Sequence, residues 1–275
     1  MSKLDDILWR RGVMAIVNAT PDSFYASSRT QSQMSVAMRV EQVLKEGPAI
    51  IDIGGYSSRP DADDVATVEE WNRVDMALSA TREVSSEVAV SIDTFRAEIV
   101  RRAYEKYGGI IVNDIMAGQG DTEMLKTVAE LKLPYIAMHM RGTPQTMQSQ
   151  TQYDDVVADV ANELQVRLSA MEMAGIDRKR VALDPGFGFA KTLEQNYELL
   201  AGLDRLTALK QPLLVGVSRK SMVYKPLGIT PDEALAATQT LHWEALRQGA
   251  TLLRVHDVKE AVQTIKLYEK YDKSY

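Results

Sequence analysis

Eight short, almost continuously apolar runs recur along the whole chain, and they limit the folds it can adopt more than any other feature does. Each run is rich in β-branched residues and lacks the alternation of a half-exposed strand. Such runs are typical of strands buried on both faces of a parallel sheet. They span residues 13–17, 49–53, 88–92, 109–112, 134–138, 181–183, 213–217 and 251–255.

Helical periodicity fills the stretches between these runs. Val36, Val40, Val43 and Leu44, for example, share one face of a predicted helix that ends before Gly47, and a glycine in that place is a helix-stop signal. Eight strand–helix units in roughly 250 residues predict a (β/α)₈ TIM barrel. Because no linker or break in composition divides the chain, we expect a single domain over residues 1–275. A doubly wound open sheet is the alternative, although it normally has fewer strands.

Charge and composition exclude several classes of function. The chain has 32 Lys and Arg against 38 Asp and Glu, a net charge of -6, which argues against a dedicated nucleic-acid or anionic-membrane binder. It has no cysteine, so disulfides, cysteine zinc sites and thiol nucleophiles are excluded. Residues 1–12 lack the cationic and apolar regions of a signal peptide, and no run approaches the roughly 18 apolar residues of a membrane span. We expect a cytoplasmic protein.

Polar residues follow every apolar run, which is where a barrel places its active site. Asp93, Asn113 and Asp184 offer acceptors and one amide at the ends of three runs. This set suits the edge of a nitrogen heterocycle with several N–H donors, such as an amino-oxo pyrimidine ring. A single carboxylate after a strand is more often a helix cap, and Asp114 and Asp257 are interpreted in that way.

Cationic residues make up the second half of this polar set. Arg59, Lys220, Arg254 and the potentially cationic His256 follow other runs, and arginine grips phosphate bidentately. Asn18 offers a neutral oxygen to Mg²⁺, a cation that usually keeps several waters and leans on substrate phosphates. The strand ends therefore predict a site for a nitrogen heterocycle that carries a phosphorylated group.

Two further patterns are interpreted as structural. The three histidines His139, His242 and His256 have a spacing that matches no zinc motif. The charged run at residues 69–73, EEWNR, is interpreted as the solvated face of a helix.

The strand-end motifs resemble those of dihydropteroate synthase, a family of folate-pathway enzymes. The resemblance extends over residues 13–262. It is carried by NATPDSF from Asn18, IDIGGYSSRP from Ile51, SIDTFR from Ser91, VNDI from Val112, MHMRGTPQTMQ from Met138, LDPGFGFAKT from Leu183, GVSRKSM from Gly216 and RVHDV from Arg254.

This resemblance implies a Mg²⁺-dependent enzyme that joins 6-hydroxymethyl-7,8-dihydropterin pyrophosphate to p-aminobenzoate and releases pyrophosphate and 7,8-dihydropteroate. It also implies a homodimer. The residues that match the family's pterin site are Asp93, Asn113, Asp184, Lys220 and Arg254. Those that match its pyrophosphate site are Asn18, Arg59, Arg254 and His256, with Asn18 as the contact to Mg²⁺. Those that match its p-aminobenzoate pocket are Ser58, Pro60, Phe189, Lys220 and Ser221. The catalytic set is then Lys220, Arg254, Asp93, His256 and Arg59.

The chain departs from the family pattern at Ala26, where Asp is usual, and at Ala190, where Gly is usual. The long loops after the first two strands are expected to act as lids that are poorly ordered without ligand. Two other functions stay open. A methyltetrahydrofolate:corrinoid methyltransferase would use the same barrel but has no need of a pyrophosphate cluster such as Arg59, Arg254 and His256. A non-catalytic pterin-binding paralogue is suggested only by Ala26.

Overall fold

The computed structural model describes residues 3–19, 29–56 and 65–273, and its central feature is one sheet of eight parallel strands. The sheet order is β6-β5-β4-β3-β2-β1-β8-β7. A parallel bridge between Leu183 and Leu213 joins the two ends of this order, so the sheet closes into a barrel. The predicted TIM barrel is confirmed and the open sheet is excluded. The strands are β1 (Gly12–Asn18), β2 (Ile50–Gly54), β3 (Ala89–Asp93), β4 (Ile111–Asp114), β5 (Tyr135–Met138), β6 (Val181–Asp184), β7 (Leu214–Val215) and β8 (Leu252–Val255).

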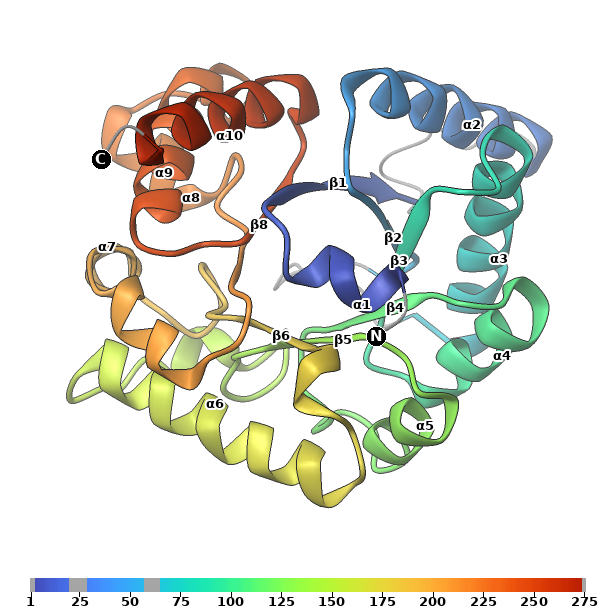
Figure 1. Cartoon of the computed structure of the whole chain (residues 1–275), viewed down its shortest axis with the longest axis horizontal. Coiled ribbons are helices and arrows are strands. Elements are labelled where there is room, and N and C mark those ends of the chain that lie inside the picture. The colour runs from blue at the N-terminus through green and yellow to red at the C-terminus, as the bar shows by residue number, and fades with distance from the viewer. Residues whose placement is uncertain (1–2, 20–28, 57–64, 274–275) are drawn as a thin grey trace.

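Helices surround the strands as an outer ring (Figure 1). They bury the outward-facing side chains of the strands, and α2 ends at Glu46, directly before the predicted stop at Gly47. The α-helices are α1 (Lys3–Leu8), α2 (Arg29–Glu46), α3 (Thr67–Val84), α4 (Ala97–Tyr107), α5 (Met124–Leu131), α6 (Val156–Met173), α7 (Leu193–Ala201), α8 (Ser221–Tyr224), α9 (Leu235–Arg247) and α10 (Val258–Asp272). Short 3₁₀ turns are η2 (Met147–Ser149), η3 (Arg178–Arg180), η4 (Leu203–Leu209), η5 (Lys225–Leu227) and η6 (Pro231–Glu233). That residues 1–275 form a single domain stays a prediction.

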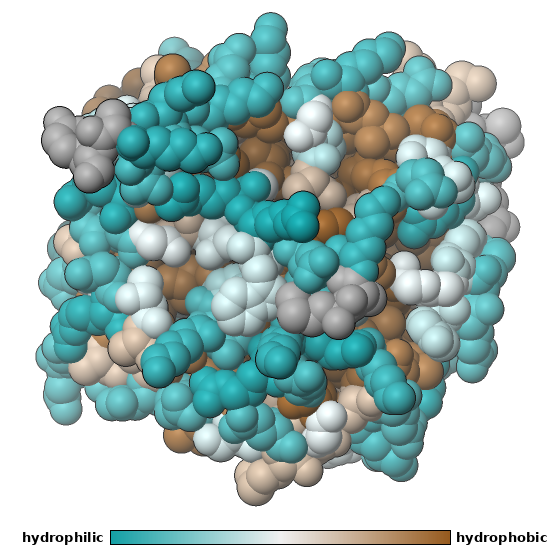
Figure 2. All heavy atoms as spheres, viewed as in Figure 1, coloured by the Kyte–Doolittle hydropathy of each residue, from teal (hydrophilic) through white to brown (hydrophobic). Residues whose placement is uncertain are grey.

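The barrel interior is apolar at the end where the strands begin, and α1 closes this end. This helix lies across the centre of the ring (Figure 1), on a face that is mostly hydrophilic at its surface (Figure 2). Leu4, Ile7 and Leu8 of α1 pack against a layer of inward-facing strand residues. That layer comprises Met14, Ile50, Ala89, Ile111, Ile136, Ala182, Leu214 and Leu252. This end of the barrel is therefore filled by packing.

The next inward-facing layer is polar. Successive side chains of a strand point to opposite faces, so the residue two positions beyond each apolar one also points inward. Five of the eight positions hold Asp52, Ser91, Asn113, Asp184 and Arg254, whereas the other three hold Ile16, Met138 and Gly216. The barrel interior thus changes from an apolar plug to a largely polar layer within two residues, toward the ends where the polar loops begin.

The interpretation of residues 69–73 as a solvated face is wrong for Glu70. Its side chain is fully buried at the start of α3. It accepts a hydrogen bond from Thr94 Oγ1 at 2.6 Å and pairs with Arg96 at 2.7 Å. Buried charges need such partners, and both partners lie in the connection between β3 and α4, which the local run does not reveal.

Candidate active site

Arg254 lies between two carboxylates inside the barrel. From β8, its Nε donates to Asp52 Oδ2 on β2 at 2.7 Å, and its Nη2 donates to Asp93 Oδ2 on β3 at 2.7 Å. The Arg254 side chain is 22% exposed and Asp52 is fully buried. Charge-assisted bonds of this length are among the strong ones, so the guanidinium is held in one orientation at the polar end of the barrel.

Asp52 is the functional residue that sequence reasoning missed. Besides Arg254 it accepts hydrogen bonds from Ser91 Oγ and from Asn113 Nδ2, the latter at 3.3 Å. It therefore connects three strands beneath the predicted pterin residues. The available signal was a single Asp in an otherwise apolar run, in register with Ser91 and two residues before Gly54, which pairs with Asp93.

Lys220 and Asp184 form the opposite side of the same site. Lys220 follows β7 and donates from Nζ to the carbonyl oxygen of Phe187 at 2.5 Å, and its ammonium lies 4.7 Å from the ring centre of Phe189. Asp184 ends β6 and accepts a hydrogen bond from the backbone N–H of Gly186 at 2.7 Å. The loop after β6 thus supplies both a carbonyl and an aromatic face to the lysine.

Burial changes the protonation of these groups. It raises the pKa of Asp93 to about 7 against the opposing charge of Arg254, and it raises the pKa of Asp184 against Lys220. It lowers the pKa of Lys220 to about 8, although Asp184 acts to raise it. Burial also disfavours the charge on Arg254, but Asp52 and Asp93 together raise its pKa. Such perturbed groups gathered in one place are typical of a functional site.

His256 lies beside this cluster and is neutral. Desolvation by its surroundings, followed by the charge of Arg254, lowers the pKa of the imidazole. Its Nδ1 lies 3.1 Å from Ser218 Oγ, and its carbonyl oxygen accepts from Arg39 Nη2 at 2.7 Å. At pH 7 the ring therefore contributes hydrogen bonds to the site, and the cationic character expected of His256 is not present.

Neither of the two predicted helix caps, Asp114 and Asp257, caps a helix. Asp114 accepts from the backbone N–H groups of Met116 and Gly118 at 2.8 and 2.7 Å, so it caps the turn after β4, whereas α5 begins only at Met124. Asp257 makes no side-chain cap to α10. It instead pairs with Arg219 through both carboxylate oxygens, at 2.9 and 2.7 Å. This pair joins the loop that carries Lys220 to the loop that carries His256.

Several predicted residues cannot be placed relative to this cluster. Ser58, Arg59 and Pro60, the Ala26 departure, and most of the two predicted lid loops lie outside the described residues. Asn18 is described: it ends β1, is half-buried, and its backbone is in register with Gly54. Ser221 is half-buried and begins α8 directly after Lys220.

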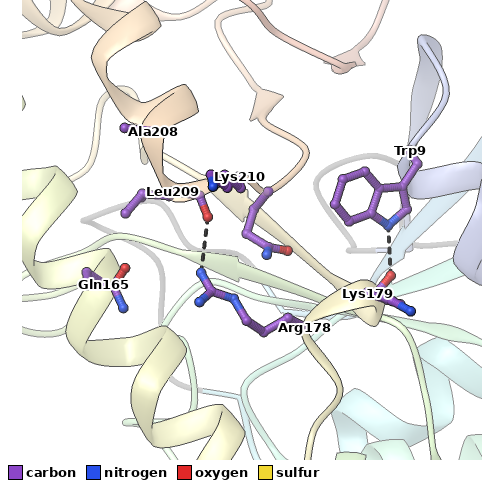
Figure 3. Close-up of a pocket in the computed structure, with 8 residues that line it drawn as sticks. Trp9, Gln165, Arg178, Lys179, Ala208, Leu209 and Lys210 are labelled. Carbon is purple, nitrogen blue, oxygen red and sulfur yellow. Dashed lines mark hydrogen bonds between the residues drawn. The ribbon is translucent and has the colours of Figure 1, made fainter.

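A separate pocket of 430 Å³ lies at the other end of the barrel (Figure 3). It is lined by Trp9, which follows α1, by Arg178 and Lys179 of η3, and by residues at the end of η4. Arg178 Nη2 donates to the Leu209 carbonyl at 3.1 Å across it. Since these segments precede β6 and β7, the pocket faces the strand beginnings, away from the polar cluster, and barrel chemistry belongs to the strand ends.

Comparison with known proteins agrees with the geometry. A family model described as "Pterin binding enzyme" matches residues 14–256. Dihydropteroate synthase of Escherichia coli strain K12 is 40% identical over 257 residues, which cover 94% of this chain and 90% of that protein. The chain belongs to the dihydropteroate synthase family. The family inferred from the strand-end motifs is thereby confirmed.

Solved structures of the family have the same fold. Dihydropteroate synthase of Xanthomonas albilineans with 4-aminobenzoic acid matches with a TM-score of 0.88 at 38% identity, covering 96% of this chain and 94% of that one. The same enzyme in complex with 7,8-dihydropteroate matches with a TM-score of 0.85 at 35% identity, covering 96% of this chain and 95% of that one.

In the part of the chain that the structure describes, no helix is both long and apolar enough to cross a membrane. The same residues contain no group of three or more His, Cys, Asp or Glu side chains that could hold a metal ion by themselves.

Proposed function

We propose that the strand-end cluster around Arg254 is the pterin and pyrophosphate site of a dihydropteroate synthase. The family reaction condenses 6-hydroxymethyl-7,8-dihydropterin pyrophosphate with p-aminobenzoate, giving 7,8-dihydropteroate and pyrophosphate in folate biosynthesis. The observation that carries the assignment is the guanidinium of Arg254, held by Asp52 and Asp93 at the polar end of the barrel. It leaves donors for an anionic group beside acceptors for a heterocycle.

The acceptors suit the pterin ring. Asp93, Asn113 and Asp184 come from β3, β4 and β6 and lie at the strand ends. There the carboxylates accept hydrogen bonds from the N–H groups of the ring, and the amide of Asn113 donates one to the ring carbonyl. Lys220 and Arg254 flank the ring with positive charge. Because both carboxylates are largely buried, their hydrogen bonds to a ligand exclude water and hold the ring in one orientation.

The chemistry requires little of the protein beyond this placement. The bond between the pterin methylene carbon and the bridging oxygen breaks, and pyrophosphate leaves with the electron pair while the electron-rich ring delocalises the developing cation. The amine nitrogen of p-aminobenzoate then forms the new C–N bond and loses a proton. Arg254, Arg59 and His256 stabilise the leaving group by charge and hydrogen bonds.

We assign the Mg²⁺ contact to Asn18. Asn18 is half-buried at the end of β1, and a Cβ on the neighbouring Gly54 would lie 3.6 Å from its Oδ1 and 3.7 Å from Asp93 Cβ, so its neutral oxygen lies beside the cluster that contains Asp93. This donor suits an ion that is held chiefly by waters and substrate phosphates. When bound, Mg²⁺ would neutralise oxygens of the pyrophosphate.

We assign the p-aminobenzoate pocket to the side of the cluster that is formed by Phe189, Lys220 and Ser221. The family resemblance adds Ser58 and Pro60, which lie outside the described residues. Phe189 presents an aromatic face beside the Lys220 ammonium, which suits a flat ring bearing a carboxylate. The amine of such a ligand would then point toward the pterin side of Lys220.

The test is pyrophosphate release from the purified chain with Mg²⁺. Release only when both substrates are present supports the synthase, whereas release without p-aminobenzoate, or none at all, contradicts it. Arg254→Ala and Asp184→Ala should each lower turnover at least about a hundredfold, the scale of one preorganised electrostatic contact. Arg247→Ala, which removes a partly exposed ion pair with Glu244 on α9, is the matched control. A near-normal rate in either site variant would contradict the assignment.

We further propose that the protein acts as a homodimer in the cytoplasm. Both statements rest on the family resemblance. Light scattering during size-exclusion chromatography tests the first. A single species at the 30.6 kDa mass of one chain would contradict it.

A further inference from the structure

A buried lysine lies next to the cluster and has no part in the chemistry above. Lys191 is 4% exposed and lies near the end of the loop between β6 and α7. Its Nζ donates to the carbonyl oxygens of Gly186 and Phe189, both at 3.0 Å, and lies 3.0 Å from His139 Nδ1. One ammonium therefore contacts two points of the loop and the end of β5.

The partners of Lys191 define the tautomer of the histidine. His139 Nε2 lies 3.0 Å from Glu163 Oε2 on α6, and burial lowers the pKa of the ring to about 4, so the ring is neutral. The ionised carboxylate of Glu163 can only accept a hydrogen bond, so Nε2–H donates to it and Nδ1 of the neutral ring accepts from Lys191 Nζ. Burial lowers the pKa of Lys191 itself to about 7, and its Nζ donates in either protonation state. Arg141 pairs with the other oxygen of the same carboxylate, at 2.9 Å from its Nε. Lys191 is thereby connected through His139 to the negative charge of α6.

The loop that Lys191 holds is tightly packed and bears the groups assigned to the p-aminobenzoate pocket. A side chain on Gly186 would come within 1.9 Å of the His139 carbonyl oxygen, so the loop lies directly against the end of β5. Phe187 supplies the carbonyl that holds Lys220, and Phe189 supplies the aromatic face. Both positions depend on the backbone conformation between residues 186 and 189.

We propose that Lys191 is a positioning residue that holds the β6–α7 loop in the shape required to bind p-aminobenzoate. This inference rests on the proposed function, because it takes Phe189 and Lys220 as the pocket for that substrate. Removing the ammonium frees two carbonyls and leaves His139 Nδ1 without its donor. The loop then relaxes, and the aromatic face and the Lys220 anchor move together. The pterin residues Asp93 and Asn113 are on other strands and keep their places.

The experiment compares Lys191→Met, a side chain of similar length without donors, with the wild-type chain. We expect the KM for p-aminobenzoate to rise about tenfold or more, the scale of losing hydrogen bonds to a charged group. The Kd for pterin pyrophosphate, measured by calorimetry without p-aminobenzoate, should change by less than about threefold, which is less than the loss of one such hydrogen bond would cause. Lys126→Met removes an exposed lysine of α5 and should leave both constants unchanged.

Glu163→Gln is the second variant. It leaves Lys191 in place and weakens the contact between His139 and residue 163 on α6. It should raise the KM for p-aminobenzoate by a smaller factor than Lys191→Met. A role in stability alone would lower the melting temperature with the KM for p-aminobenzoate unchanged, or would shift the constants for both substrates in parallel, and either result would overturn the proposal. An unchanged KM for p-aminobenzoate in Glu163→Gln would overturn it even if Lys191→Met does not fold. Wild-type turnover tests the proposed function independently of both variants.

Discussion

Replacing Asp52 by Asn tests how far the buried carboxylate determines the site. Asp52 is fully buried and Arg254 Nε donates to it at 2.7 Å. Asn is the same size and keeps one oxygen that can accept from Ser91. It removes the negative charge and places an N–H₂ group where the guanidinium needs an acceptor.

The expected cost follows from the geometry. Removing one partner of a fully buried ion pair destabilises a protein by about 3–5 kcal/mol. Here Arg254 keeps its 2.7 Å bond to Asp93 and is 22% exposed, so solvent and the second carboxylate offset part of the loss. We expect about 2–3 kcal/mol, which corresponds to a decrease in Tm of roughly 4 °C for a chain of this length. Because the guanidinium is no longer held on two sides, kcat/KM for the pterin pyrophosphate should fall about a hundredfold.

The assay combines urea unfolding with steady-state pyrophosphate release. Asp75→Asn removes a carboxylate from the more exposed ion pair with Lys106 and is the control, since such pairs contribute at most about 1 kcal/mol. The charge of Asp52 also helps to raise the pKa of Asp93, so the variant should shift the acid limb of the pH–rate profile to lower pH. Stability within about 0.5 kcal/mol of wild type, below the usual contribution of one hydrogen bond, with an unshifted acid limb would refute the reasoning.

Two further predictions concern protonation and backbone strain. The kcat/KM for the pterin pyrophosphate should rise with pH as Asp93 loses its proton near pH 7, and it should fall as Lys220 loses its proton near pH 8. Asp93→Asn should abolish the rise. A flat pH profile of the wild-type chain would contradict both assignments. Ala190, at φ 49°, adopts a left-handed conformation that favours glycine. Ala190→Gly should therefore change the unfolding free energy by less than about 1 kcal/mol, because the relief of backbone strain offsets the added entropy of the unfolded chain. Ala190→Val should destabilise the protein by more than about 2 kcal/mol, because position 190 is buried and a β-branched residue is strained in this conformation. Equal stabilities of the two variants in denaturant unfolding would be inconsistent with strain at this position.

The fold could be predicted because its signals are local. All eight apolar runs became strands whose ends lie within two residues of the prediction, since a strand buried on both faces must be apolar throughout. The order of the polar strand ends followed from the barrel itself, in which successive strands are neighbours. The motifs at those ends, RVHDV and LDPGFGFAKT among them, are also local in sequence, and they therefore identified the family and its reaction.

The partners of the buried charges were decided only by the tertiary structure. Asp52 and Arg254 are 202 residues apart in sequence, and they meet because β8 pairs with β1 and so lies only one strand away from β2. Lys191 and His139 meet in the same way from two loops. A sequence determines that a carboxylate stands in an apolar run, and thus that it must find a partner when buried. Which cation satisfies it depends on long-range packing, because the cost of burying a charge is met by whatever group the closed fold brings within hydrogen-bond distance.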